Sequence, residues 1–125
     1  MILGTGIDII EVARIRASHE KFGERFAGRI LLASELEYCL SHKDPAPFIA
    51  VRFAAKEAVS KAFGTGIGAS IGWQDIEVKR KETGEPFVLL HGKGADLFQR
   101  REATGLHLSL SHTLHYATAM AILEN

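Results

Sequence analysis

The pattern of apolar and polar positions in the first third of the chain predicts a strand followed by helices. Residues 2–10 form an apolar run with glycines at positions 4 and 6, which is typical of a central strand that another backbone approaches closely. Between residues 11 and 27, apolar side chains recur at helical spacing, and basic side chains occupy the rest of the predicted helix surface. Gly23 weakens this helix and is expected to divide it into two pieces.

A capping signature and a proline-rich break define the next two predicted helices. Ser34 followed by Glu37 has the spacing of a capping box, which predicts a short helix through Leu40. A break at residues 44–47 then leads into a long alanine-rich helix, which is expected to stop at Gly64.

The second half of the chain predicts two hairpins with a helix between them. Alternating polar and apolar residues, separated by turn sequences, are typical of paired strands with one buried face. The predicted elements are strands at 75–79 and 87–90, a helix at 94–104, and strands at 107–111 and 116–123. The order strand, three helices, two strands, helix, two strands predicts an α+β fold with a largely antiparallel sheet packed by the long helix.

Size and composition limit the kind of protein that this chain forms. With 125 residues it is expected to be a single domain, residues 1–125, which is small for a deep cleft of its own, so a site shared between subunits fits its size. Fifteen basic and fifteen acidic residues cancel, which argues against nucleic acid or an anionic membrane as a partner. Cys39 is the only cysteine, so no internal disulfide forms and a reducing compartment, the cytoplasm, is expected. No apolar run reaches the length of about 18 residues that a membrane span requires.

Two carboxylates occupy otherwise apolar segments. Asp8 lies among isoleucines in the first predicted strand, where an ionised carboxylate has to be paired or bound to a cation. A simpler interpretation is an aspartate at the edge of the core that bonds to backbone amides or caps the next helix. Glu57 precedes Lys61 by one turn, the spacing of an ordinary surface ion pair, although the surrounding alanines indicate a packed helix face. A hard divalent cation that holds phosphate is the alternative partner for both carboxylates.

Groups suited to phosphate lie close to these carboxylates in the sequence. Arg52, Lys56 and Lys61 on the long helix are candidate counter-charges, and the glycine-rich loop 64–68 offers backbone amides. His112 follows a predicted strand and is a candidate for phosphate binding or proton transfer. The spacing of the histidines does not match a zinc site, and no nucleophile lies beside a base in a motif of covalent catalysis.

Three sequence blocks, taken together, resemble a known enzyme family. The blocks are Gly6-Ile7-Asp8, the run from Arg52 to Ala58 followed by Lys61, and Ser109-Leu110-Ser111-His112. They resemble the holo-acyl-carrier-protein synthases, the short bacterial class of 4′-phosphopantetheinyl transferases, and the similarity extends over nearly the whole chain. The resemblance implies the fold of that family. It also implies transfer of phosphopantetheine from coenzyme A to a serine of an apo acyl carrier protein, with release of adenosine 3′,5′-bisphosphate, in fatty acid biosynthesis.

The same resemblance implies roles for individual residues. Asp8 and Glu57 would bind Mg²⁺, Lys61 would lie beside the bridging or leaving oxygen, and Glu57 would accept the serine proton directly or through a metal-bound water. The residues that would line the coenzyme A site are Arg52, Lys61, Gly64, Thr65, Gly66, Pro86, Ser111 and His112. Those that would dock the acidic carrier protein are Arg14, Lys21 and Arg25, although a solvated helix face explains Lys21 equally well.

The resemblance also implies an oligomeric state, and the chain departs from the family pattern at one position. Family members look like trimers that bind coenzyme A between neighbouring subunits, so a homotrimer with shared sites is expected. Thr113 stands where some relatives have an acidic residue, so no acid is expected to orient His112 from that position.

Two other functions fit the same residues. One is a different Mg²⁺-dependent phosphotransfer or diphosphate-cleaving enzyme, which would act on a nucleotide without a protein acceptor. The other is a non-catalytic trimeric binding module in which Asp8 and Glu57 only neutralise internal cations. The binding module predicts that Glu57→Gln leaves ligand binding intact and that no turnover depends on Mg²⁺.

Overall fold

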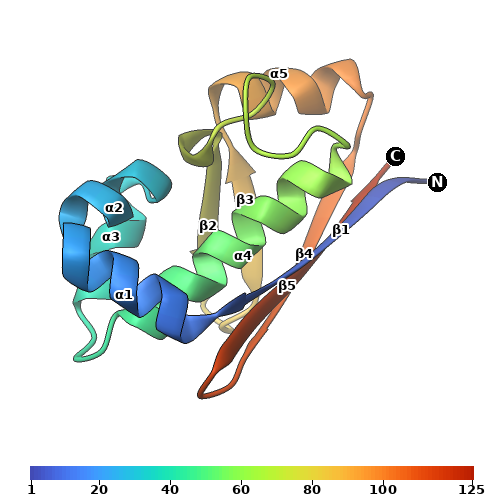
Figure 1. Cartoon of the computed structure of the whole chain (residues 1–125). Coiled ribbons are helices and arrows are strands. Elements are labelled where there is room, and N and C mark those ends of the chain that lie inside the picture. Colours follow the sequence, from blue (N-terminus) through green and yellow to red (C-terminus); the bar gives the residue numbers. More distant parts are fainter.

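The computed structural model, which describes residues 1–125, has the order of elements that the sequence predicts (Figure 1). The elements are β1 (Ile2–Glu11), α1 (Val12–Phe22), α2 (Glu24–Ile30), α3 (Ala33–Leu40), α4 (Ala46–Ala62), a 3₁₀ turn η1 (Trp73–Asp75), β2 (Ile76–Arg80), β3 (Pro86–Leu90), α5 (Gly92–Arg100), β4 (Gly105–His112) and β5 (Tyr116–Glu124). Gly23 separates α1 from α2 as expected, and its φ of 60° is one that glycine adopts without strain. The predicted α+β fold is confirmed. None of the helices has both the length and the apolarity to span a membrane.

Two antiparallel sheets lie on either side of the long helix α4. β1, β5 and β4 pair in that order, and β2 pairs only with β3. In Figure 1, α4 crosses one face of the three-stranded sheet, while the β2–β3 hairpin and α5 lie on the other side of the helix. The opposite face of the three-stranded sheet carries no helix.

Gly4 and Gly6 allow β1 to lie directly against α4. A Cβ atom on Gly6 would lie 1.8 Å from the carbonyl oxygen of Ala58, and one on Gly4 would lie 2.0 Å from that of Ala62. The close backbone approach that the glycines predict is therefore confirmed. The prediction of a central strand is wrong, because β1 pairs only with β5 and forms an edge of the sheet.

Replacing Gly6 by Ala is expected to lower the free energy of unfolding by about 2–3 kcal/mol, because the added methyl group meets a backbone oxygen that cannot rotate away. Gly28 is the matched control, since it lies inside α2 with open space around it. Gly28→Ala is expected to stabilise the protein by about 0.5–1 kcal/mol. Urea unfolding at one protein concentration measures both changes, and wild-type stability of Gly6→Ala would contradict the tight packing of β1 on α4.

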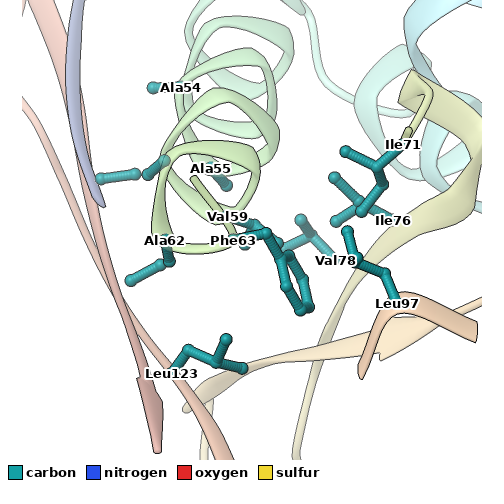
Figure 2. Packing of buried hydrophobic residues seen from close by; sticks show 13 residues of the cluster. Ala54, Ala55, Val59, Ala62, Phe63, Ile71, Ile76, Val78, Leu97 and Leu123 are labelled. Atoms are coloured by element: carbon teal, nitrogen blue, oxygen red, sulfur yellow. The ribbon is translucent and has the colours of Figure 1, made fainter. Parts of the chain in front are cut away.

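The core fixes the rotation of α4 about its own axis. One cluster of buried side chains joins the second half of α4 to both sheets, and Figure 2 shows Phe63 pointing between Leu123 and Val78. A second cluster packs α1 and α2 onto the first half of the helix. Towards the C-terminal end of α4, Glu57 and Lys61 remain on a partly exposed stripe.

The helix α3 begins differently from the prediction. The capping box predicted from Ser34 and Glu37 is wrong, because the helix starts at Ala33 and Ser34 lies inside it. The backbone N–H of Leu32 instead donates to the Glu35 carboxylate (2.8 Å). The hydroxyl of Ser34 instead donates to Glu77 Oε2 on β2 (2.8 Å).

The helix α5 is shorter than the prediction at its C-terminal end. It covers Gly92–Arg100 rather than 94–104, and Glu102 has a φ of 55° that ends the helical path. The N–H of Thr104 donates to the carbonyl oxygen of Glu124 (2.8 Å), so pairing with β5 already begins where the helix was predicted to continue.

Candidate active site

Asp8, Glu57 and Lys61 come together where the edge strand β1 lies against α4. Glu57 and Lys61 are one turn apart on α4, and Asp8 is on the half-buried face of β1. The Lys61 ammonium donates to Asp8 Oδ1 (3.2 Å) and to the carbonyl oxygen of Ile7 (3.0 Å). Lys61 therefore pairs with Asp8 and not with Glu57, so the alternative of an ordinary Glu57–Lys61 surface pair is wrong.

One oxygen of the Asp8 carboxylate is buried without a protein partner. This oxygen, Oδ2, accepts no hydrogen bond, and no side chain caps α1, so the alternative in which Asp8 caps that helix is wrong. Burial raises the pKa of Glu57 above its usual value, the negative charge of Asp8 raises it further, and Lys61 opposes both effects. Glu57, whose ionisation is opposed by burial and by a neighbouring carboxylate, and Asp8, which has a buried unpaired oxygen, form a donor set that suits a hard cation.

A surface depression of about 300 Å³ opens beside these groups. It is lined by Ile7, Asp8, Ile9, Lys61 and Thr118. The Thr118 hydroxyl donates to the carbonyl oxygen of Asp8 (2.8 Å), which holds the strand in place at this point. The side chain of Lys61 is 48 % exposed, so the depression is open to solvent.

Glu57→Gln is expected to make the metal-free protein more stable at pH 7 than the wild type. The pKa of Glu57 in the folded state lies above its usual value of 4.5, so the folded state holds this proton more tightly than the unfolded state. The contribution of Glu57 to stability is therefore fully present below pH 4.5 and is lost as the pH rises through the folded pKa. Chemical unfolding in EDTA from pH 3.5 to 8 should show the two proteins diverging as the pH rises.

Glu77 provides a control of opposite sign. Hydrogen bonds from His91 and Ser34 lower the pKa of Glu77, so its contribution to stability is present above pH 4.5 and lost as the pH falls through the folded pKa. Glu77→Gln is thus expected to be less stable than the wild type at pH 7. Parallel stability curves for Glu57→Gln and the wild type would contradict the burial of Glu57 beside a second negative charge.

Lys56 is not available to phosphate, so that part of the sequence prediction is wrong. Its side chain is fully buried, and its ammonium donates to Glu35 Oε1 (2.7 Å) and to the carbonyl oxygens of Ile30 (2.7 Å) and Trp73 (3.1 Å). Burial lowers the pKa of Lys56, and the Glu35 carboxylate opposes this shift. Lys56 therefore ties α2, α3 and η1 to α4.

Arg52 lies about 140° around α4 from Glu57, because each residue of a helix adds about 100°. Its side chain is buried, its guanidinium lies 4.5 Å from the centre of the Tyr38 ring, and it donates to the carbonyl oxygen of Phe48 (3.2 Å). The Nε of Arg52 is buried without a partner. A buried guanidinium with an unused donor is suited to an anion.

Two further predicted residues lie at the same end of the molecule as Arg52. The cavity beside Arg52 measures about 160 Å³, and its other lining residues are Ser34, Glu35, Tyr38, Glu77, Val78, Lys79 and Arg80. Pro86 pairs with Arg80 across the β2–β3 hairpin. The ring of His112 lies 6.3 Å from that of Phe48. Arg52, Pro86 and His112 thus form a second group of predicted residues.

The backbone amides of the glycine loop after α4, which were predicted to be free, are hydrogen-bonded within the protein. The N–H of Gly64 donates to the carbonyl oxygen of Lys61 (2.8 Å), and those of Thr65 and Gly66 both donate to the carbonyl oxygen of Ser60 (3.2 Å each). The prediction of free donors at 64–66 is therefore wrong. The loop is a compact turn that continues from Lys61, with its Thr65 side chain exposed.

Ser111 and His112 occupy opposite faces of β4, because successive strand residues alternate. Ser111 is opposite Thr118 on the face of the sheet that carries no helix. The same face presents Ile7 and Ile9, which are 67 % and 65 % exposed. This outer face is therefore apolar at its β1 edge and polar along β4.

Within one chain, the predicted residues thus form two separate groups. Asp8, Glu57, Lys61 and the loop 64–66 lie along the second half of α4, whereas Arg52 lies with Pro86 and His112. No residue lines both the depression beside Asp8 and the cavity beside Arg52. Asp8 and Arg52 therefore line different hollows of one chain.

Comparison with known proteins identifies the family. The family model described as the 4′-phosphopantetheinyl transferase superfamily matches residues 4–119. The chain belongs to this superfamily. A holo-[acyl-carrier-protein] synthase from Koribacter versatilis is 50 % identical over 125 residues and covers 100 % of both chains.

Solved structures agree with this transferase family. The crystal structure of holo-[acyl-carrier-protein] synthase from Neisseria meningitidis has a TM-score of 0.93 and 34 % identity, with 100 % of both chains covered. The Helicobacter pylori holo-[acyl-carrier-protein] synthase in complex with coenzyme A has a TM-score of 0.86 and 32 % identity, and the match covers 96 % of this chain and 99 % of that one. The resemblance drawn from the three sequence blocks is confirmed, and the chain is an enzyme of this type.

The transferase also has a basic surface on α1 and α2. Arg14, Lys21 and Arg25 are all exposed there. The Lys21 ammonium lies 5.3 Å from the centre of the Phe22 ring, so its side chain lies along an apolar neighbour.

Sequence analysis of this transferase missed an apolar pocket within the basic surface. The pocket measures about 210 Å³ and is lined by Phe22, Arg25, Phe26 and Arg29. Phe22 and Phe26 are among the apolar residues that recur at helical spacing between residues 11 and 27, but α1 ends at Phe22, before Gly23, and Phe22 is 50 % exposed. A phenylalanine directly before a helix-breaking glycine was the available signal.

Proposed function

We propose that the chain transfers 4′-phosphopantetheine from coenzyme A to a serine hydroxyl of an apo acyl carrier protein and releases adenosine 3′,5′-bisphosphate. The observation that carries this proposal is the unpaired, buried oxygen of Asp8 beside Glu57 and Lys61, in a chain of the transferase family. The holo-[acyl-carrier-protein] synthases that resemble the chain over its whole length support the choice of donor and acceptor.

Mg²⁺ is the cation that we propose for the two carboxylates. Magnesium in proteins commonly takes one or two carboxylates, and waters and substrate phosphates complete its coordination. Asp8 and Glu57 offer such a pair, and the pKa of Glu57 is raised first by burial and then by the charge of Asp8, effects that a bound cation would oppose. When bound, Mg²⁺ would neutralise diphosphate charge and orient the phosphorus for attack.

In the proposed reaction, the serine oxygen attacks the phosphorus that carries pantetheine. A new oxygen–phosphorus bond forms as the bond to the bridging oxygen of the diphosphate breaks, and the bisphosphate leaves with that oxygen. Glu57 takes the serine proton, directly or through a water, and its raised pKa suits it to this role. The Lys61 ammonium, held by Asp8 and by the β1 backbone, stabilises charge that develops on the bridging oxygen.

We propose that a neighbouring subunit supplies the residues that bind the nucleotide part of coenzyme A. Arg52, Pro86 and His112 suit this side, and the buried, unused Nε of Arg52 is a donor for phosphate. Ser111 would contribute from the outer face of the sheet, and the loop at Gly64, Thr65 and Gly66 would bound the diphosphate.

A homotrimer would explain why the two groups of site residues lie apart in one chain and why apolar side chains are exposed on the outer face of the sheet. The outer sheet face presents Ile7 and Ile9 together with Met120, which is 43 % exposed. Exposed apolar side chains gathered on one face are typical of a protein interface. A ring built from one repeated heterologous contact makes equivalent sites at every interface.

The basic surface of α1 and α2 is the proposed docking site for the carrier protein. Arg14, Lys21 and Arg25 provide positive charge, which accelerates association with an acidic partner. The pocket between Phe22 and Phe26 would receive an apolar side chain of that partner. We further place the reaction in fatty acid biosynthesis, which the similarity to holo-[acyl-carrier-protein] synthases supports, and in the cytoplasm, whose reducing conditions suit the free thiol of Cys39.

The experiment that tests the function is intact-mass analysis of an apo acyl carrier protein incubated with this protein, coenzyme A and Mg²⁺. A mass increase of one phosphopantetheine that EDTA abolishes and Mg²⁺ restores is the expected result. Binding of coenzyme A without any mass increase on several carriers would support the binding module instead. Cleavage of coenzyme A without a carrier would support the diphosphate-cleaving enzyme.

A further inference from the structure

Arg101 connects α5 to the end of α4 that borders the proposed active site. Its guanidinium donates through Nη1 to the carbonyl oxygen of Phe63 (2.7 Å) and through Nη2 to that of Leu3 (3.4 Å). Phe63 is the C-cap residue of α4, directly before the glycine loop. None of the ion pairs in the structure involves Arg101, so its guanidinium is hydrogen-bonded to backbone carbonyls and paired with no carboxylate.

The position of Arg101 matters because the C-terminal end of a helix repels anions. The last carbonyl groups of α4 lack partners within the helix and carry about half a negative charge. The glycine loop starts at this end, and the amides of Thr65 and Gly66 are turned inward to Ser60. The loop amides at 64–66 satisfy the carbonyl groups of Ser60 and Lys61 and are not left as donors for a diphosphate, whereas the Phe63 carbonyl at the same helix end receives its hydrogen bond from Arg101.

Lys93 makes a similar contact at the other end of the same loop. Its ammonium donates to the carbonyl oxygen of Ala69 (3.1 Å). Lys93 within α5 and Arg101 directly after it thus donate to carbonyl groups on both sides of residues 64–68. The loop is therefore anchored by a cationic donor on each side.

We propose that Arg101 is a positioning residue for coenzyme A. By donating to the Phe63 carbonyl, it fixes the glycine loop and reduces the repulsion between the negative end of α4 and the diphosphate. This inference rests on the proposed function, because it assumes that the loop at Gly64 to Gly66 bounds the diphosphate. It adds a residue outside the three family blocks and gives it an electrostatic role. Arg101 would not touch the reacting atoms.

The test compares variants of Arg101 with a matched variant one residue earlier. Arg100 also lies at the end of α5, but it is exposed and makes no side-chain hydrogen bond, so Arg100→Gln removes the same charge without the contact. Calorimetry gives the Kd for coenzyme A without a carrier protein, and steady-state assays give KM for coenzyme A and for the carrier separately.

Arg101→Gln is expected to raise the Kd and KM for coenzyme A about tenfold, within the range for a charge at a helix end, and to leave KM for the carrier within about twofold. Arg101→Lys keeps the charge and is expected to recover most of the affinity. Arg100→Gln should bind as the wild type does. The loss in Arg101→Gln should shrink at 1 M salt, where screening weakens an electrostatic contribution.

Three results would overturn the inference. They are wild-type affinity of Arg101→Gln for coenzyme A, equal losses in Arg101→Gln and Arg100→Gln, and a loss in Arg101→Gln that affects both substrates alike and follows its melting temperature. The last pattern would make Arg101 only a structural tether. If the wild type itself neither binds coenzyme A nor modifies a carrier, the proposed function fails, and this outcome is recognised before any variant is compared.

Discussion

Glu57→Gln is expected to lower kcat/KM for carrier modification by about 10²–10⁴-fold, the range for loss of a general base. The amide keeps the shape of the carboxylate, but it can neither take the serine proton nor offer a charge to Mg²⁺. Asp8→Asn is expected to act in the same direction, because it removes the second charge while its amide oxygen can still accept the hydrogen bond from Lys61. Time courses of intact carrier mass, with saturating Mg²⁺, measure both losses.

Asp96→Asn is the matched control for this prediction. Asp96 is exposed on α5 and makes no ion pair, so its replacement is expected to leave kcat/KM within about twofold of the wild type. The thermal stability of Glu57→Gln should not fall, which would separate lost chemistry from lost folding. Wild-type turnover by Glu57→Gln would remove Glu57 from the mechanism.

Mixing two inactive variants tests whether the active site is shared between subunits. Asp8→Asn damages one group of site residues and Arg52→Gln the other, so each protein alone should be nearly inactive. Dissociation and reassembly of an equimolar mixture should restore about a quarter of the wild-type activity, because one interface in four combines two intact groups. Activity no higher than that of the separate variants would place both groups in one subunit.

The elements of the fold could be predicted because their signals are local. The apolar strand at 2–10, the break at Gly23 and the alternating hairpin at 75–90 depend on residues that are neighbours in the sequence. The position of β1 in its sheet could not be predicted in this way. Gly4 and Gly6 indicate that a backbone comes close, but the sequence does not say that this backbone is a helix.

The site was predictable only in part, for a related reason. Asp8, Glu57 and Lys61 lie in recognisable blocks, and they do come together. Arg52, Lys56 and Lys61 were grouped as phosphate ligands because all are cations on one helix. An alanine-rich helix buried on most sides has no polar stripe that shows which cation faces solvent, so their separation depends on distant partners such as Glu35.

Lys56→Met is expected to lower the free energy of unfolding by about 3–5 kcal/mol, the cost of leaving one partner of a buried ion pair alone. Glu35 is only 2 % exposed, and its carboxylate would remain in the core without a counter-charge. The ammonium also satisfies the carbonyl oxygens of Ile30 and Trp73, which would lose a donor. Urea unfolding at fixed protein concentration measures the loss.

Burial, and not distance, should decide the size of this effect. The Arg16–Asp44 pair has the same separation of 2.7 Å, but its side chains are 39 % and 56 % exposed. Arg16→Met is therefore expected to cost no more than about 1 kcal/mol. Adding Glu35→Gln to Lys56→Met should recover part of the stability, because it removes the buried unpaired charge. Similar losses for Lys56→Met and Arg16→Met would contradict this account, and with it the view that Lys56 anchors the helix that carries Glu57.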